Sequence, residues 1–127
     1  MSINTQLFNA VTGSFTGNND LYIGALNSST SSINPFFQVE TVQSPGLEGA
    51  SLYFVTSPYA LTGKSIADLK KEFLGTICEV RVNPDQTPGQ RRCVSGDVYS
   101  VDGNYFAAWL ETSAVAKVKL SAWLNEF

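Results

Sequence analysis

A phosphate-binding loop is the first chemistry that the residue types suggest. Thr62, Gly63, Lys64 and Ser65 form a Thr-Gly-Lys-Ser run between a β-prone segment and an expected helix. In nucleotide-binding loops, backbone N–H groups surround the phosphates while the Lys and the hydroxyl complete the site. The full pattern needs a glycine five residues before the second glycine, and this chain has Pro58 there. We therefore expect Ser65 to cap a helix, and keep an anion site at Gly63, Lys64 and Ser65 as a minor alternative.

Acid–base and metal chemistry have few candidate residues. The sequence contains no histidine, which removes the commonest general base and every Ser-His or Cys-His nucleophile pair. Two cysteines without histidine cannot make a standard zinc site. Asp97 and Glu111 are the acidic residues expected on apolar sheet faces, and they fall on opposite faces. We predict no catalytic residues, no metal site and no cofactor.

The two cysteines admit two interpretations. Cys78 and Cys93 lie on expected strands that can be neighbours, so a cross-strand disulfide is compatible with the pattern. In a reducing compartment, such residues are more often small buried hydrophobes. A redox role is typical of a Cys-x-x-Cys pair, which this sequence lacks. We favour two free, buried thiols.

Composition and charge argue against several classes of partner. Only 15% of the 127 residues are charged, against roughly 25% in average domains. The net charge is −3 and the basic residues are not clustered, which argues against nucleic-acid binding. No apolar run is long enough to span a membrane. The first residues lack the basic and apolar regions of a signal peptide, so we expect a cytoplasmic protein, or one incorporated into a particle assembled there.

The N-terminal half has the composition of a loop-rich sheet. We expect one domain over residues 1–127, in which residues 12–50 are rich in Gly, Ser, Thr and Asn. Short β-prone segments bounded by turn residues predict strands at 21–26, 36–42 and 51–56. The helical spacing of Ile3, Leu7 and Val11 indicates a short opening helix.

Residues 65–127 begin with the clearest local pattern in the chain. Ile66, Leu69 and Phe73 share one helical face, which predicts a helix near 65–74 that ends at Gly75. Apolar residues then alternate with charged ones over 76–82, as in a half-buried strand.

Residues 91–101 and 104–112 are expected to form a β-hairpin. Asp102-Gly103 between them is a preferred pair for a two-residue turn. The resulting register places apolar side chains on both faces of the ribbon. One face has Cys93, Tyr99, Phe106 and Leu110, and the other has Val94, Val98, Tyr105 and Trp109. Because a sheet in water needs only one apolar face, a helix of the chain or a partner must cover the second.

The C-terminal segment fits two patterns. Residues 115–120 alternate as in a strand, whereas a helix would collect one apolar stripe consisting of Ala116, Leu120, Trp123, Leu124 and Phe127. Val118 falls outside that stripe, but the longer pattern favours a helix near 114–126. The predicted fold is therefore α+β, a mostly antiparallel sheet of about six strands with helices near 65–74 and 114–126.

These features favour a non-enzymatic structural or assembly subunit of a larger protein complex, such as a component of a virus or phage particle. Self-association is the expected mode of contact, and the candidate interaction residues are Val94, Val98, Tyr105, Trp109, Trp123 and Phe127. The alternative is a small-ligand or carbohydrate-binding module that uses loop amides and aromatic side chains. An enzyme is the third hypothesis.

Overall fold

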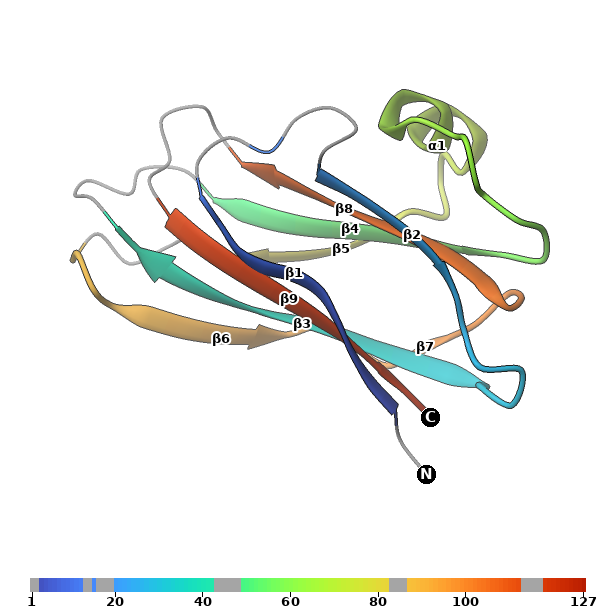
Figure 1. Ribbon diagram of the computed structural model, residues 1–127, viewed down its shortest axis with the longest axis horizontal. Helices are drawn as coiled ribbons and strands as arrows, with labels where there is room; N and C mark the ends of the chain where they lie inside the picture. Colours follow the sequence, from blue (N-terminus) through green and yellow to red (C-terminus); the bar gives the residue numbers. More distant parts are fainter. Residues whose placement is uncertain (1–2, 13–14, 16–19, 43–48, 83–86, 113–117) are drawn as a thin grey trace.

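Among the residues that it describes, the computed structural model contains two antiparallel sheets and one α-helix (Figure 1). The structure describes residues 3–12, 15, 20–42, 49–82, 87–112 and 118–127. In these residues the chain is mostly β, so the predicted α+β class is wrong. No helix in the described residues is long and apolar enough to cross a membrane.

The first sheet, called sheet A, contains the two ends of the described chain. Its strands lie in the order β1 (Ile3–Thr12), β9 (Val118–Glu126), β3 (Ser32–Thr41) and β6 (Arg91–Ser95), and β7 (Tyr99–Ser100) also pairs with β3. Burial alternates along β3 and β9, with every second side chain buried. Sheet A therefore has one face in the core and one face outside.

The second sheet, called sheet B, packs against the first. Its order is β2 (Leu21–Ala25), β8 (Tyr105–Thr112), β4 (Ala50–Ser57) and β5 (Cys78–Val82). The chain passes from one sheet to the other at every connection except those from β4 to β5 and from β6 to β7. This strand order is that of a jelly roll, a double sheet built from Greek-key connections.

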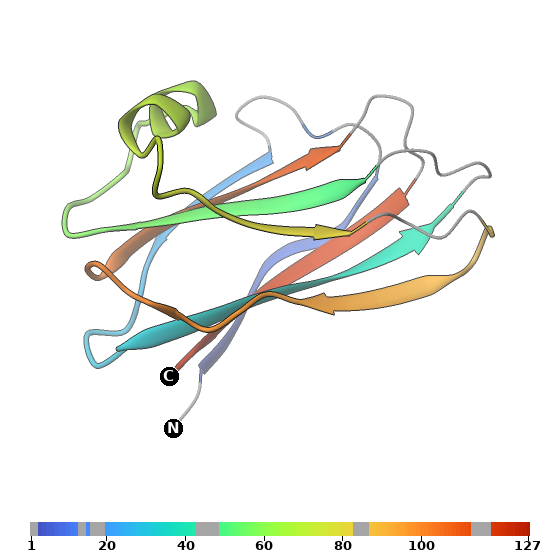
Figure 2. The ribbon, with the colours of Figure 1, turned by 180° about the vertical axis from the view of Figure 1, so that it is seen from behind.

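The core lies between the sheets, and a second apolar cluster lies on the outer side of sheet B. Phe37 and Leu124 of sheet A and Leu52 and Leu110 of sheet B are among the buried core residues. The outer cluster is formed by Val55, Leu61, Leu69, Ala107 and Trp109. Leu69 belongs to α1 (Ile66–Glu72), and Figure 2 shows this helix on the side of sheet B away from sheet A. Strand β8 is thus apolar on both faces, and α1 covers the outer one.

The predicted terminal helices are both strands. Residues 118–126 form β9, and residues 114–117 of the expected helix lie outside the described residues. Leu120 and Leu124 are four apart, a spacing that fits one face of a helix and equally one face of a strand. Val118, the exception to the helical stripe, is fully buried in β9. In β1, Ile3, Leu7 and Val11 are also four apart, so the same ambiguity accounts for the predicted opening helix.

The predicted hairpin over 91–112 is also wrong. β6 and β7 pair with β3 in sheet A, whereas β8 pairs with β2 and β4 in sheet B. The turn at Asp102 and Gly103 therefore connects the two sheets. The helix near 65–74 and the strands near 21–26, 36–42, 51–56 and 76–82 are confirmed, although β3 starts earlier, at Ser32.

β6 and β7 form one edge of sheet A that is broken at residues 96–98. The Gly96 N–H donates to the Pro35 carbonyl (2.8 Å), and the Asn34 amide donates to the Gly96 carbonyl (2.7 Å). In an antiparallel sheet, the backbone N–H and C=O of one residue point to the same neighbouring strand. The Pro35 carbonyl points to Gly96, so the backbone N–H that proline lacks would also point to this break, where no strand partner needs it. A Cβ on Gly96 would lie 2.6 Å from Val80 Cγ2. Glycine therefore lets the two sheets approach closely here.

Candidate interaction surface

The six residues predicted to form an interaction patch lie in different parts of the sandwich. Trp109 is fully buried under α1, so it is not offered to a partner. Val94 is half-buried and packs against the core from β6. Val98, Tyr105 and Phe127 are exposed by 63%, 36% and 46%. Trp123 is half-buried on β9. Side chains alternate between the two faces of a strand, and the residues on either side of Trp123 are buried, so Trp123 points away from the core.

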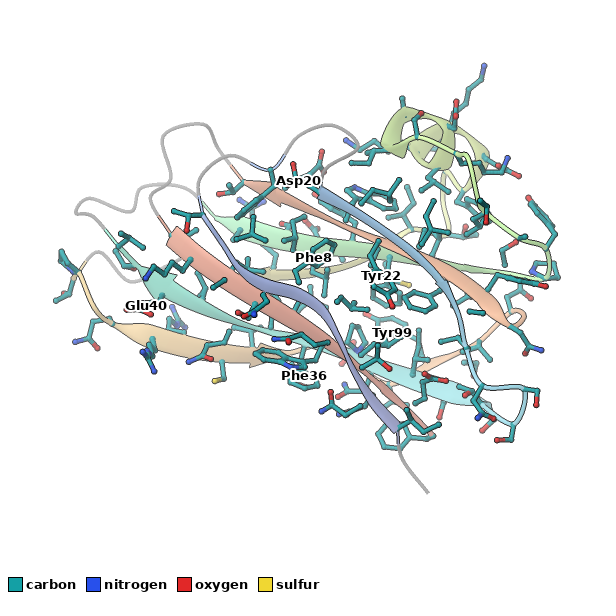
Figure 3. All side chains as sticks on the ribbon, viewed as in Figure 1. Phe8, Asp20, Tyr22, Phe36, Glu40 and Tyr99 are labelled. Atoms are coloured by element: carbon teal, nitrogen blue, oxygen red, sulfur yellow. The ribbon has the colours of Figure 1, made fainter. Side chains whose placement is uncertain are left out.

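The outer face of sheet A, called the open face, collects Trp123 with side chains that the sequence did not place together. Its outward residues on β9 and β3 alternate with the buried core positions. No element among the described residues packs over this face as α1 packs over sheet B. Figure 3 shows Phe8, Tyr22 and Tyr99 between the layers and Phe36 on the opposite side of sheet A.

An aromatic pair lies at the centre of the open face. Phe36 and Trp123 are register partners, and their rings stack with centroids 5.4 Å apart and planes 12° apart. Gln6 of β1 and Ser95 of β6 extend this row on either side. A cross-strand aromatic pair stabilises a sheet by about 0.2–1 kcal/mol. Phe36 was missed as a site residue because only the pairing of β3 with β9 brings it to Trp123.

Uncharged polar residues surround the aromatic pair. Asn34 faces Asn125 on one side of the pair, and Gln38 faces Ser121 on the other. The charged residues of the open face are confined to one end, where Glu40 faces Lys119 and lies 3.3 Å from the Arg91 guanidinium nitrogen Nε. The centre of the open face therefore consists of rings, amides and hydroxyls, together with the exposed thiol of Cys93 opposite Gln38.

Two shallow hollows lie on the open face on either side of the aromatic row. One has a volume of about 280 Å³ and has Phe36 in its wall together with Asn34, Ser95 and Asn125. The other, of about 180 Å³, lies toward the charged end and is lined by Gln38, Ser121 and the charged residues. The aromatic row thus lies between two depressions, and Cys93 and Val94 also line the larger one.

The residues of the possible anion site cap α1. Ser65 Oγ accepts from the Asp68 N–H (3.1 Å), and Asp68 Oδ2 accepts from the Ser65 N–H (3.0 Å). The hydrogen bond from the Ser65 backbone N–H, with a further contribution from the Ser65 side chain, holds the pKa of the Asp68 carboxyl below its ordinary value. Lys64 Nζ lies 2.8 Å from Glu72 Oε2, and this contact lowers the pKa of Glu72. The helix end thus has its own carboxylate where a bound anion would lie, and this argues against an anion site.

Removal of the capping hydroxyl gives the first testable prediction. Ser65→Ala is expected to lower the free energy of unfolding by about 1 kcal/mol, because the helix loses its N-cap acceptor. Thr62→Ala, in the exposed turn before the helix, is the control and is expected to change little. Urea denaturation measures both, and equal losses would contradict this role for Ser65. Because the pKa of Asp68 is lowered, its stabilisation is present above the unfolded-state pKa and is lost as pH falls through the folded-state pKa.

The other chemistry-bearing residues do not converge. Cys78 and Cys93 are free and lie in opposite sheets, on β5 and β6. Cys78 is half-buried, and burial raises the pKa of its thiol, whereas Cys93 is exposed, so the prediction that it is buried is wrong. Asp97 is exposed at the break between β6 and β7, while Glu111 accepts from Lys70 at 2.6 Å. No group of His, Cys, Asp or Glu in the described residues could hold a metal ion.

Comparison with known proteins yields similarity of fold only. No protein-family model and no curated sequence matches the chain. It is similar to chains in the structures of infectious bursal disease virus, Gx strain (12% identity, TM-score 0.58) and Gt strain (11%, 0.59). The matches extend over 99% and 100% of this chain, but over only 31% and 32% of the virus chains. This chain therefore spans about a third of their length. The globular domain of zebrafish complement 1qA is more distant, with TM-score 0.48, 11% identity and coverage of 99% and 94%. At these identities the two virus chains share a fold with this chain.

Proposed function

We propose that this protein is a non-enzymatic structural or assembly subunit, and that it packs against further copies of itself through the open face. One observation carries the proposal. The chain uses its described helix to cover the outer face of sheet B, and it leaves the stacked Phe36 and Trp123 half-exposed on sheet A. The fold shared with chains of a virus supports a place in a particle, and we extend the proposal to a virus or phage component.

The chemistry of the open face suits contact with protein. Interface cores are enriched in aromatic residues and depleted of charged ones. Amides and hydroxyls lose less free energy than ions when they leave water, and they can donate and accept across a symmetric contact. A twofold axis along the aromatic row would set the Asn34–Asn125 pair of one copy against Gln38 and Ser121 of the other. Such an arrangement satisfies amides on both copies.

Trp123→Ser tests the proposal. We expect self-association to weaken at least about tenfold, because large central aromatic residues dominate interface energetics. Lys119→Ser is the matched control, since Lys119 lies on the same strand at the charged end and is expected to have little effect on affinity. Light scattering coupled to size-exclusion chromatography measures the masses, and circular dichroism checks that both variants fold. A wild-type protein that stays monomeric at high concentration would refute self-association.

Carbohydrate binding is the second candidate function, and one hollow favours it. The depression of about 280 Å³ combines an aromatic wall, Phe36, with Asn34, Ser95 and Asn125. An apolar wall with a few placed polar groups is the usual composition of a ligand site. A glycan array separates the two functions. A sugar that binds the wild type and not Phe36→Ala would favour carbohydrate binding, whereas an assembly subunit gives no hit.

A further inference from the structure

A cavity of about 230 Å³ opens at the side of the sandwich, away from the open face. Its apolar wall comes from both layers and from the C-cap of α1, and consists of Ile33, Phe54, Phe73 and Tyr99. It exists because the pairing of β5 with β4 ends at Cys78 and Phe54, while β7 on the opposite sheet is only two residues long. We call it the side cavity.

Aromatic rings form the deep part of the side cavity. Phe54 and Tyr99 meet edge to face, with centroids 5.2 Å apart and planes 72° apart. Phe54 is 3% exposed and Tyr99 is half-buried, and Figure 3 shows Tyr99 between the two sheets. Burial raises the pKa of Tyr99, with a smaller contribution from the charge of Asp97, so its hydroxyl is neutral at physiological pH. Tyr99 is therefore the more accessible ring of this pair, and Phe54 is buried against it.

The polar groups of the side cavity are acidic or neutral. Asp102 is the charged residue of the lining, and no Lys or Arg is among the described residues that form it. Thr56, Thr76 and Ser100 add hydroxyl groups. Thr56 Oγ1 accepts from the Asp102 N–H (3.1 Å), which fixes the turn that carries the carboxylate.

We propose that the side cavity binds an ammonium group carried on a short apolar stem, whether that of a free amine or of a lysine side chain in another chain. The stem packs on Phe73, and the cation is attracted by the Tyr99 ring and by Asp102, while the buried Ile33 and Phe54 close the back of the cavity. A carboxylate ligand would be repelled by Asp102, and a neutral ligand would gain only the apolar contact. This proposal does not depend on self-association through the open face, so either proposal can be refuted while the other holds.

Cys78 provides a direct measure of occupancy, because it lines the side cavity and is free. In a Cys93→Ser background it is the remaining thiol, and its alkylation by iodoacetamide can be followed by mass spectrometry. The probes are 2-phenylethylamine, 2-phenylethanol and phenylacetate, with a blocked lysine derivative as a fourth. At a concentration several times its Kd, the amine is expected to slow alkylation at least about fivefold, the alcohol less, and the carboxylate not at all.

Asp102→Asn should lower the affinity for the amine by about tenfold and remove the preference for the amine over the alcohol. Asp20→Asn, at the start of β2, is the charge-matched control and should change neither; Figure 3 shows Asp20 well apart from Tyr99. Protection by the lysine derivative would assign the site to a protein side chain, and protection by the free amine alone would assign it to a small molecule. Equal protection by amine and alcohol in the wild type, or no protection by either cation, would overturn the proposal.

Discussion

Gly103→Ala is expected to lower the free energy of unfolding by at least about 3 kcal/mol, from steric overlap added to backbone strain. A Cβ at this position would lie 2.2 Å from the Ser57 carbonyl oxygen and 2.4 Å from Pro58 Cα. Both are backbone atoms, so no side-chain rotation can relieve the overlap. With φ at +149°, Gly103 also has a conformation that L-residues rarely adopt. The connection between the sheets would have to move away from the end of β4.

Gly63→Ala and Gly89→Ala separate strain from overlap. These glycines have φ values of +86° and +84°, and among the described residues no atom lies within 4 Å of the position that a Cβ would occupy on either glycine. Each substitution should therefore cost only about 1 kcal/mol, the strain contribution. Urea denaturation of all three variants measures the difference. If Gly103→Ala loses no more stability than Gly63→Ala, the close packing of this turn is wrong.

Trp109→Ala is expected to destabilise the protein by about 3–5 kcal/mol, the range for removal of a large buried aromatic side chain. Trp109 is fully buried in the cluster between sheet B and α1. Its ring stacks on Tyr53 with centroids 5.7 Å apart and planes 16° apart. Leu61 and Leu69 complete the contact from the outer side. Without the indole, the apolar cluster between β8 and α1 loses its largest side chain.

Trp109→Phe is the informative companion. The buried indole N–H has no hydrogen-bond partner among the described residues, so phenylalanine removes an unsatisfied donor along with some volume. The loss should be about 1–2 kcal/mol, well below that of the alanine variant. Guanidinium denaturation, followed by far-UV circular dichroism, measures both. A phenylalanine variant as unstable as the alanine variant would show that the N–H has a bonding partner in solution.

Elements with a strong local pattern could be predicted from the sequence. The helix of residues 66–72 has its stripe and its Ser65 cap, and β5 has its alternation of apolar and charged residues. The need to cover a second apolar face was also readable, because Trp109 and Ala107 alternate with Phe106 and Leu110 along β8. The pattern left open whether a helix of the chain or a partner provides this cover. The structure has α1 there, and the C-terminal segment is a strand.

The failures come from pairing that is not local. A turn pair such as Asp102-Gly103 does not reveal whether the following strand returns to the same sheet or enters the opposite one. In β9, the buried Glu126 occupies a core-facing position that an apolar pattern would not assign to an acid. Its carboxylate accepts from the Asn27 N–H (2.8 Å) and the Thr30 hydroxyl (2.6 Å), and these contacts come from a distant loop. The stack of Phe36 on Trp123 likewise depends on the pairing of β3 with β9, two strands that are far apart in the sequence.

The two borders of sheet A limit how copies of this molecule can join. β1 is irregular on both sides of Phe8, and Ala10 within it has a positive φ of 53°; the opposite border is interrupted at Gly96. Strands shaped in this way are poor templates for hydrogen bonding to a new strand, so cross-β growth into fibrils is disfavoured there. Copies that meet through sheet A would therefore stack as finished sandwiches, and such an assembly stops growing once its faces are occupied.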